Sequence, residues 1–160
     1  MRNSRSTGSD PRAAALRLLT GRDRSEAELQ KKLLQLGFSA EQAEEARLYC
    51  REYGYLDDRR YALDRARMLI RSGRGVGAKV LLDLRRRGIE ESTAQAALAQ
   101  AGEEFEPLDL LQEQLERRFP GFDYRRADDR LKRRVVSYFQ RRGYRLEQIF
   151  SLLHDDGDSP

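Results

Sequence analysis

The chain has 160 residues, 39% of them apolar and 36% charged, and its formal net charge is +4. So little apolar material argues against one thick core and favours amphipathic helices that each bury a narrow stripe. One cysteine excludes both an intramolecular disulfide and a cysteine-based metal cage. Leu, Ala, Arg, Glu and Gln dominate and Trp is absent, so we expect an all-α protein.

Along the chain, three segments share the pattern of a helix-like run that ends in glycine and one large apolar residue. They are SEAELQKKLLQLGFSAEQAEEA, VGAKVLLDLRRRGIEESTAQAAL and LKRRVVSYFQRRGYRLEQIFSLL, with the pairs Gly37-Phe38, Gly88-Ile89 and Gly143-Tyr144. Glycine can adopt the left-handed conformation that ends a helix, and the apolar residue after it packs back onto the last turn. The pattern therefore predicts a tight helix–turn–helix in each segment.

The spacing of apolar residues around these glycines is the same in all three segments. Apolar side chains lie four and eight positions before and six and nine positions after each glycine: Leu33, Leu29, Ala43 and Ala46; Leu84, Val80, Ala94 and Ala97; Phe139, Val135, Ile149 and Leu152. This register predicts an internal repeat of about 50 residues.

A further helix-like stretch precedes each pair, at 11–20, 58–71 and 107–118. Three helices in each of three units is the simplest description, so we predict three tandem three-helix repeats. The predicted units span 10–54, 55–102 and 103–154, with a disordered tail at 1–9 and an acidic tail at 155–160.

The stretch REYGYLDDRRYA, residues 51–62, places two carboxylates in tandem within a basic region. Asp57 is well placed as a helix N-cap and Asp58 as the first helical residue, where carboxylates meet free amides. Leu56 and Tyr61 have the spacing of a hydrophobic staple across that cap. No His, Cys or third carboxylate lies beside the pair in sequence, so we interpret it as the start of the second unit rather than as a catalytic or metal site.

Other candidates for chemistry are weak. His154 is the single histidine and lies near the C-terminus, which argues against a triad or zinc site. The glycines of GRGVG, residues 73–77, lack the preceding strand and the Lys-Ser/Thr of a nucleotide loop, although Arg74 could contact a phosphate. No apolar run is long enough to cross a membrane. We expect a cytoplasmic protein that is not an enzyme and binds no cofactor or metal.

The charges are distributed unevenly. Residues 59–87 hold ten Lys/Arg against two Asp, and residues 125–145 hold nine against two. Residues 102–116, between them, carry six carboxylates and no basic residue. A solvated helical surface accounts for some such runs, but two separated basic blocks favour a polyanionic partner.

One helix face carries this difference between the units. The positions nine and two before each glycine lie seven apart, hence on one stripe that we expect to point away from the core. The first unit has Glu28 and Gln35 there. The other units have only basic residues: Lys79, Arg86, Arg134 and Arg141. Together with neighbouring arginines these are the candidate contact residues: Arg59, Arg60, Arg71, Arg74, Lys79, Arg85, Arg86, Arg134 and Arg141.

The motifs at residues 15–38, 52–62 and 75–89 resemble those of the RecX family, bacterial regulators of the RecA recombinase. The first is similar to the family's opening unit, at Arg22, Ser25, Glu26, Glu28, Leu29, Lys32 and Leu33. The structural signature comprises the Gly-Tyr-Leu-Asp-Asp motif and the turn glycines: Gly54, Tyr55, Leu56, Asp57, Asp58, Gly37, Gly88 and Gly143. The resemblance covers residues 13 to about 101, and the third unit matches only in its repeat pattern. Tyr61 stands where the family often has Phe.

The resemblance implies an elongated, curved array that binds as a monomer along the groove of a RecA–DNA filament. There it would block strand exchange, ATP hydrolysis and repressor cleavage, and some family members also bind DNA. The alternative from the residues alone is a sequence-tolerant DNA- or RNA-binding protein that acts without a recombinase. A helical enzyme is the third possibility, with no catalytic constellation to support it.

Overall fold

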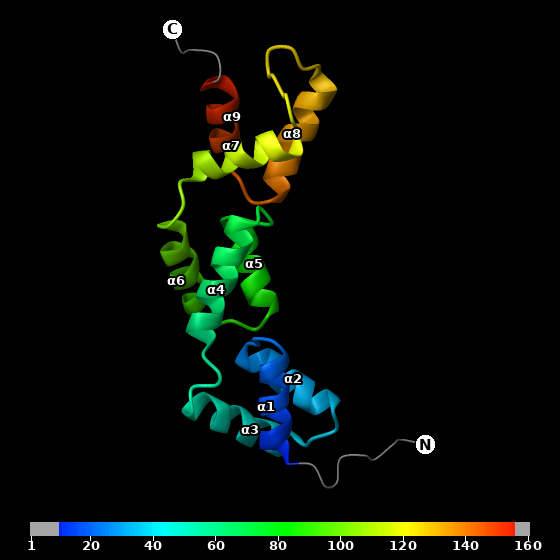
Figure 1. The fold of residues 1–160 in the computed structure, drawn as a ribbon, viewed down its shortest axis with the longest axis vertical. Helices are drawn as coiled ribbons and strands as arrows, with labels where there is room; N and C mark the ends of the chain where they lie inside the picture. The colour runs from blue at the N-terminus through cyan, green and yellow to red at the C-terminus, as the bar shows by residue number, and fades with distance from the viewer. Residues whose placement is uncertain (1–9, 156–160) are drawn as a thin grey trace, which may run out of the picture.

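The computed structural model describes residues 10–155, and every regular element in that range is an α-helix (Figure 1). In chain order the helices are α1 (Pro11–Gly21), α2 (Glu26–Gln35), α3 (Ala40–Glu52), α4 (Asp58–Arg71), α5 (Ala78–Arg86), α6 (Glu91–Gly102), α7 (Pro107–Arg118), α8 (Asp129–Arg141) and α9 (Leu146–Asp155). The predicted tail at 1–9 and residues 156–160 of the predicted acidic tail lie outside the described residues, whereas residue 155 ends α9.

Three separate hydrophobic clusters hold the helices together, one for α1–α3, one for α4–α6 and one for α7–α9. The side chains at the shared register positions are all buried in these clusters, with at most 8% of any of them exposed. We name the three helix groups unit 1, unit 2 and unit 3. The predicted boundaries at 54/55 and 102/103 stay predictions, and Leu56, just past the first of them, is buried in the unit 1 cluster.

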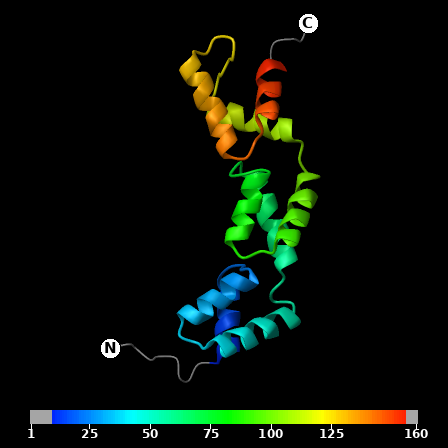
Figure 2. The same cartoon turned by 180° about the vertical axis from the view of Figure 1, so that it is seen from behind.

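The units follow one another along the long axis of the molecule, with α1–α3 at one end and α7–α9 at the other (Figures 1 and 2). The fold is therefore an elongated array of three tandem three-helix repeats (Figure 1); the register predicted the repeats, and the family resemblance implied the elongated shape. Because each unit buries its own stripe, no single core spans the described chain.

The turn after the middle helix of each unit is built the same way. Gly37, Gly88 and Gly143 have φ of 98°, 80° and 99°, the left-handed region that favours glycine. The amide after each glycine donates to the carbonyl five residues back, as from Tyr144 to Phe139 at 3.2 Å. This is the Schellman geometry that satisfies the last carbonyls of a helix.

The tandem aspartates have two different partners. Asp57 Oδ1 accepts from the amides of Arg59 and Arg60 at 3.1 and 3.2 Å, which confirms its N-cap role. Asp58 Oδ1 instead accepts from the Glu26 amide at 2.8 Å and so caps a helix of unit 1.

The predicted staple between Leu56 and Tyr61 is wrong. Leu56 packs in the unit 1 cluster, while Tyr61 lies against the unit 2 cluster. The physical reason is that the Leu56 amide donates to the Cys50 carbonyl at 3.1 Å, which holds this residue against the end of α3.

Candidate functional site

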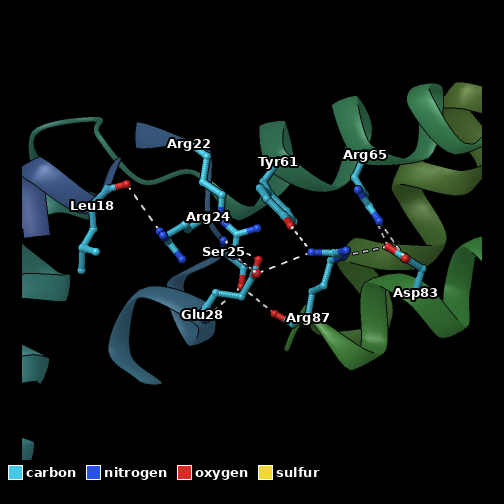
Figure 3. A network of polar contacts seen from close by, with 9 residues as sticks. All are labelled: Leu18, Arg22, Arg24, Ser25, Glu28, Tyr61, Arg65, Asp83 and Arg87. Atoms are coloured by element: carbon cyan, nitrogen blue, oxygen red, sulfur yellow. Dashed lines mark hydrogen bonds and ion pairs between the residues drawn. The ribbon is translucent and has the colours of Figure 1, made fainter. Parts of the chain in front are cut away.

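Units 1 and 2 meet at a polar junction centred on Ser25. Its hydroxyl accepts from the Glu28 amide at 3.1 Å, and the Ser25 amide donates to Glu28 Oε1 at 3.2 Å, which completes a capping box at the start of α2. The same hydroxyl donates to the Arg87 carbonyl of unit 2 (Figure 3). Ser25 is fully buried, so one side chain both caps its own helix and joins two units.

Arg87 lies at the centre of an ion-pair network across this junction (Figure 3). Its Nε donates to Asp83 Oδ1 at 3.0 Å, and its Nη1 lies 3.5 Å from Glu28 Oε2 and 3.3 Å from the Tyr61 hydroxyl. Arg65 holds Asp83 in a bidentate pair at 2.9 and 3.0 Å. The network therefore runs from α2 through the end of α5 to α4.

The pKa values of the carboxyl groups at this junction are shifted in opposite directions. Burial raises the pKa of Asp58, and the nearby charges of Glu26 and Asp57 add to the shift. Burial alone would also raise the pKa of Glu28 and of Asp83. For Glu28, hydrogen bonds and the charges of Arg87 and Arg22 outweigh burial and lower the pKa below its ordinary value.

For Asp83, the hydrogen bonds from Arg65 and Arg87 and their charges outweigh burial in the same way, so its pKa is lowered. Both Glu28 and Asp83 are therefore carboxylates at neutral pH and hold positive charge in place. The junction is stabilised by charge pairing rather than by apolar contact alone.

Beside this network lies a groove of about 690 Å³ between α2 and the end of α5. Its lining residues come from both units: Arg22, Arg24, Ala27, Glu28, Lys31, Lys32, Gln35, Asp83, Arg85, Arg86, Arg87 and Gly88. Seven of them are basic and two are acidic, so the groove attracts anions. We call it the basic groove.

The four predicted stripe residues are exposed: Lys79, Arg86, Arg134 and Arg141. Arg86 lines the basic groove together with Arg85, whose guanidinium also pairs with Glu91 at 2.9 Å. Arg134 belongs to unit 3, where it lies 6.0 Å from the Phe119 ring centroid, and neither it nor Arg141 lines the groove. The structure thus brings only part of the predicted set to one place.

The other predicted contact residues are also exposed but scattered. Arg59 lines a cleft on the α3–α4 connection that also contains Asp57, and Arg60 follows it in the first turn of α4. Arg71 lies 5.8 Å from the Phe105 ring centroid. Arg74 sits in the turn between α4 and α5.

Two features of the site were not predicted from the sequence. Unit 1 contributes four basic residues to the groove, and the Lys31-Lys32 pair was the available signal for them. Glu28, expected to point into solvent, has only 18% of its side chain exposed, because it pairs with Arg87 across the junction. Gln35 is exposed as expected.

Residues 10–155 contain no group of three or more His, Cys, Asp or Glu that could hold a metal ion. Over the same range, no helix has the length and apolar character needed to span a bilayer. Cys50 is buried, and burial raises the pKa of its thiol. What the described surface offers is a basic groove on an extended helical scaffold, which defines a helical-repeat protein with an anion-attracting face.

Comparison with known proteins identifies the family. The family model described as "RecX, first three-helix domain" matches residues 12–49. The Regulatory protein RecX of Syntrophotalea carbinolica is 42% identical over 92% of this chain and 96% of its own length, and that of Trichlorobacter lovleyi is 40% identical over 90% and 94%. The chain therefore belongs to the RecX family of regulatory proteins.

Solved structures agree with this fold. The crystal structure of RecX from Lactobacillus salivarius superposes with a TM-score of 0.69 at 21% identity, covering 91% of this chain and 93% of that one. A second crystal structure of a regulatory protein RecX gives 0.70 at 24% identity, over 91% of this chain and 72% of the other. The tandem three-helix architecture is therefore shared with proteins of low sequence identity.

Proposed function

We propose that this chain regulates a RecA recombinase by binding along the RecA–DNA filament in the cytoplasm. The observation that carries the proposal is the basic groove between units 1 and 2, together with the exposed basic residues of α5 and α8 on an extended scaffold. A filament presents phosphates and acidic side chains repeatedly along its length. An elongated array with spaced basic sites can contact several of them at once, so weak contacts add up.

The chemistry of the basic residues supports this partner. Of the 31 Lys and Arg residues in the chain, 27 are Arg. The guanidinium group is always charged and presents forked donors that match phosphate and carboxylate oxygens. The protein bound along the filament would occupy the space that a second DNA strand or a repressor needs. It would therefore limit strand exchange and repressor cleavage.

The test is a fourfold charge reversal, K79E/R86E/R134E/R141E. These four side chains are exposed, and even ion pairs on a surface are worth under about 1 kcal/mol, so helical content and melting should be retained. Filament binding should weaken greatly, and each lost phosphate contact should flatten the salt dependence by roughly one unit of slope. Binding equal to that of the parent at moderate salt would mean that the stripe is only a solvated face.

A matched pair of double variants controls for net charge. R86E/R141E changes two stripe residues, whereas R17E/R117E changes two exposed arginines that belong neither to the stripe nor to the groove. Both reverse the same number of charges. We expect a large loss of filament binding in the first and a small one in the second, and equal losses would indicate an unspecific charge effect.

The groove also supports a second candidate, a sequence-tolerant nucleic-acid-binding protein that acts without a recombinase. Its basic lining would serve a phosphate backbone equally well. Adding the chain to recombinase assembled on single-stranded DNA separates the two. A fall in ATP turnover at amounts too small to coat the DNA supports filament binding, and a fall only at saturating coverage supports competition for DNA.

A further inference from the structure

The basic groove contains two carboxylates, and they differ in where their partners lie. Asp83 is held inside unit 2 by Arg65 and Arg87 at 2.9 to 3.0 Å. Glu28 reaches out of α2 toward Arg87 of the neighbouring unit at 3.5 Å, and toward Arg22 at the same distance (Figure 3). Glu28 therefore occupies the position in which an external anion would meet these two guanidinium groups.

We propose that the Glu28 carboxylate competes with external anions for the Arg22 and Arg87 guanidinium groups in the basic groove, and that a phosphodiester backbone must displace it to bind there. This inference rests on the proposed function, because it assumes that the groove receives an anionic partner. Glu28 then has a regulatory role. The carboxylate lowers the affinity of the groove for a phosphate backbone, and binding of that backbone breaks the Glu28–Arg87 pair between units 1 and 2.

The distances show why displacement is feasible. Both Glu28 ion pairs, at 3.5 Å, are longer than the 2.9 Å pair between Arg65 and Asp83, so their attraction is weaker. Arg22 is also 59% exposed, which screens its attraction to Glu28. A phosphate in the groove offers two oxygens to the forked donors of arginine and carries a charge that repels the carboxylate.

The composition of the groove favours a phosphodiester over an acidic protein segment as the displacing group. Both walls are basic, and five of the seven basic side chains are arginines. A nucleic-acid backbone carries one negative charge on every nucleotide, so successive phosphates can contact successive basic side chains of the groove. Its binding is driven by the release of counterions. A phosphate backbone is therefore the occupant that fits this lining, and the test distinguishes it from an acidic peptide.

The variant that isolates this role is Glu28→Gln. Gln can keep the capping box, because its side-chain oxygen still accepts from the Ser25 amide, but it removes the competing charge. The control is Glu113→Gln, which makes the same change in net charge at an exposed pair with Arg117 within α7. A fluorescent single-stranded oligothymidine is the probe, titrated into the full chain at several salt concentrations.

We expect E28Q to bind the oligonucleotide at least about fivefold more tightly than the parent, as a coupling of this kind allows. E113Q should change the affinity by less than about twofold. A residue with only a structural role would show the opposite, with weaker binding after its removal. Equal affinities for E28Q and E113Q would overturn the proposal, as would a larger gain for an oligoglutamate peptide than for the oligonucleotide.

A second measurement does not depend on the variant. In the parent protein, the carboxylate carbon of Glu28 should shift in its nuclear magnetic resonance signal when oligonucleotide is added, while that of Glu113 should not. An unmoved Glu28 signal at saturation contradicts displacement. If the parent binds no oligonucleotide, or if R86E binds as well as the parent, polyanion binding in the groove is refuted as well; if R86E is weakened but E28Q matches E113Q, only the gating role fails.

Discussion

The two junctions of the array are built from different chemistry. Between units 1 and 2, most links are polar side-chain contacts: the Ser25 hydroxyl to the Arg87 carbonyl, the Asp58 carboxylate to the Glu26 amide, and a network of ion pairs, beside one close approach of Gly88 to the Ala27 side chain. Between units 2 and 3, the links are backbone and apolar.

At this second junction the Val76 amide donates to the Arg142 carbonyl at 2.7 Å, and Val76 packs against both clusters. An apolar pocket of about 320 Å³ lies beside it, lined in part by Ile70 of unit 2, Phe105 of the α6–α7 connection and Tyr144 of unit 3. Gly143 passes so close to the Val76 carbonyl that a Cβ would overlap its oxygen.

The difference teaches that one repeat can be joined in two ways with different sensitivities. A junction made of carboxylates and guanidinium groups responds to salt, pH and anionic ligands. A junction made of a backbone hydrogen bond and close apolar packing responds mainly to changes in shape. The basic groove lies at the first junction, so the ligand site and the responsive junction coincide.

The largest expected effect is at the second junction, from Gly143→Ala. The left-handed conformation costs an alanine about 1–2 kcal/mol, and the overlap with the Val76 carbonyl adds to that, for a total of about 3 kcal/mol or more. Gly54→Ala is the control, because Gly54 also has positive φ but nothing within 4 Å of an added Cβ. Urea unfolding should show that this control loses about 1–2 kcal/mol of the free energy of unfolding. Equal losses would show that the close approach has no cost.

Next comes Ser25→Ala at the first junction, compared with Ser39→Ala. Both serines form capping boxes, but the Ser39 box lies on the surface and makes no bond across a junction. Loss of a cap costs about 0.5–2 kcal/mol. Ser25→Ala also leaves the Arg87 carbonyl without this donor, which adds about 1–3 kcal/mol. If chemical unfolding gives the same loss for both variants, the bond across the junction contributes nothing.

A smaller effect is expected for Asp57→Ala, which removes a cap inside unit 2. The cost should be about 0.5–2 kcal/mol, seen as a melting temperature lower by a few degrees. Asp128→Ala removes the N-cap of α8 in unit 3, where Asp128 accepts from the Leu131 amide at 2.8 Å, and should cost about the same. Filament inhibition by the folded fraction should persist in both. Intact stability with lost inhibition would make Asp57 a contact residue instead.

The smallest effect is the response to acid, which only the first junction should show strongly. Glu28 has a lowered pKa in the folded state, so its contribution is complete above its ordinary pKa and is lost as pH falls through the folded value. Asp58 has a raised pKa, so the folded state binds its proton first and this group favours folding as pH falls. The two contributions have opposite signs and therefore partly cancel.

Urea unfolding at neutral pH and near pH 3 measures whether each carboxyl group raises or lowers the free energy of unfolding on acidification. E28Q should lose less stability on acidification than the parent, because the group that weakens in acid is absent. Asp58→Asn should lose more, because the group that compensates is absent. Changes of the same sign in the two variants would contradict the opposite shifts.

The sequence alone determined the helices, their ends and the core of each unit. The apolar register around Gly37, Gly88 and Gly143 predicted side chains that are buried in the structure, because helical periodicity is a local property of the chain. The N-cap at Asp57 followed from the same kind of local reasoning. Family membership added the regulatory class, which periodicity does not contain.

Only the tertiary structure decided how the units are joined. Ser25 and Arg87 are 62 residues apart, and a hydrogen bond between them leaves no periodic signal in either helix. The same holds for Asp58, which reads locally as a first-turn residue but caps α2 of unit 1. Glu28 was misplaced for that reason. The stripe position of Glu28 predicted the correct face of α2. Whether that face is exposed to solvent or contacts another unit depends on how whole units pack, and here Arg87 of unit 2 pairs with it.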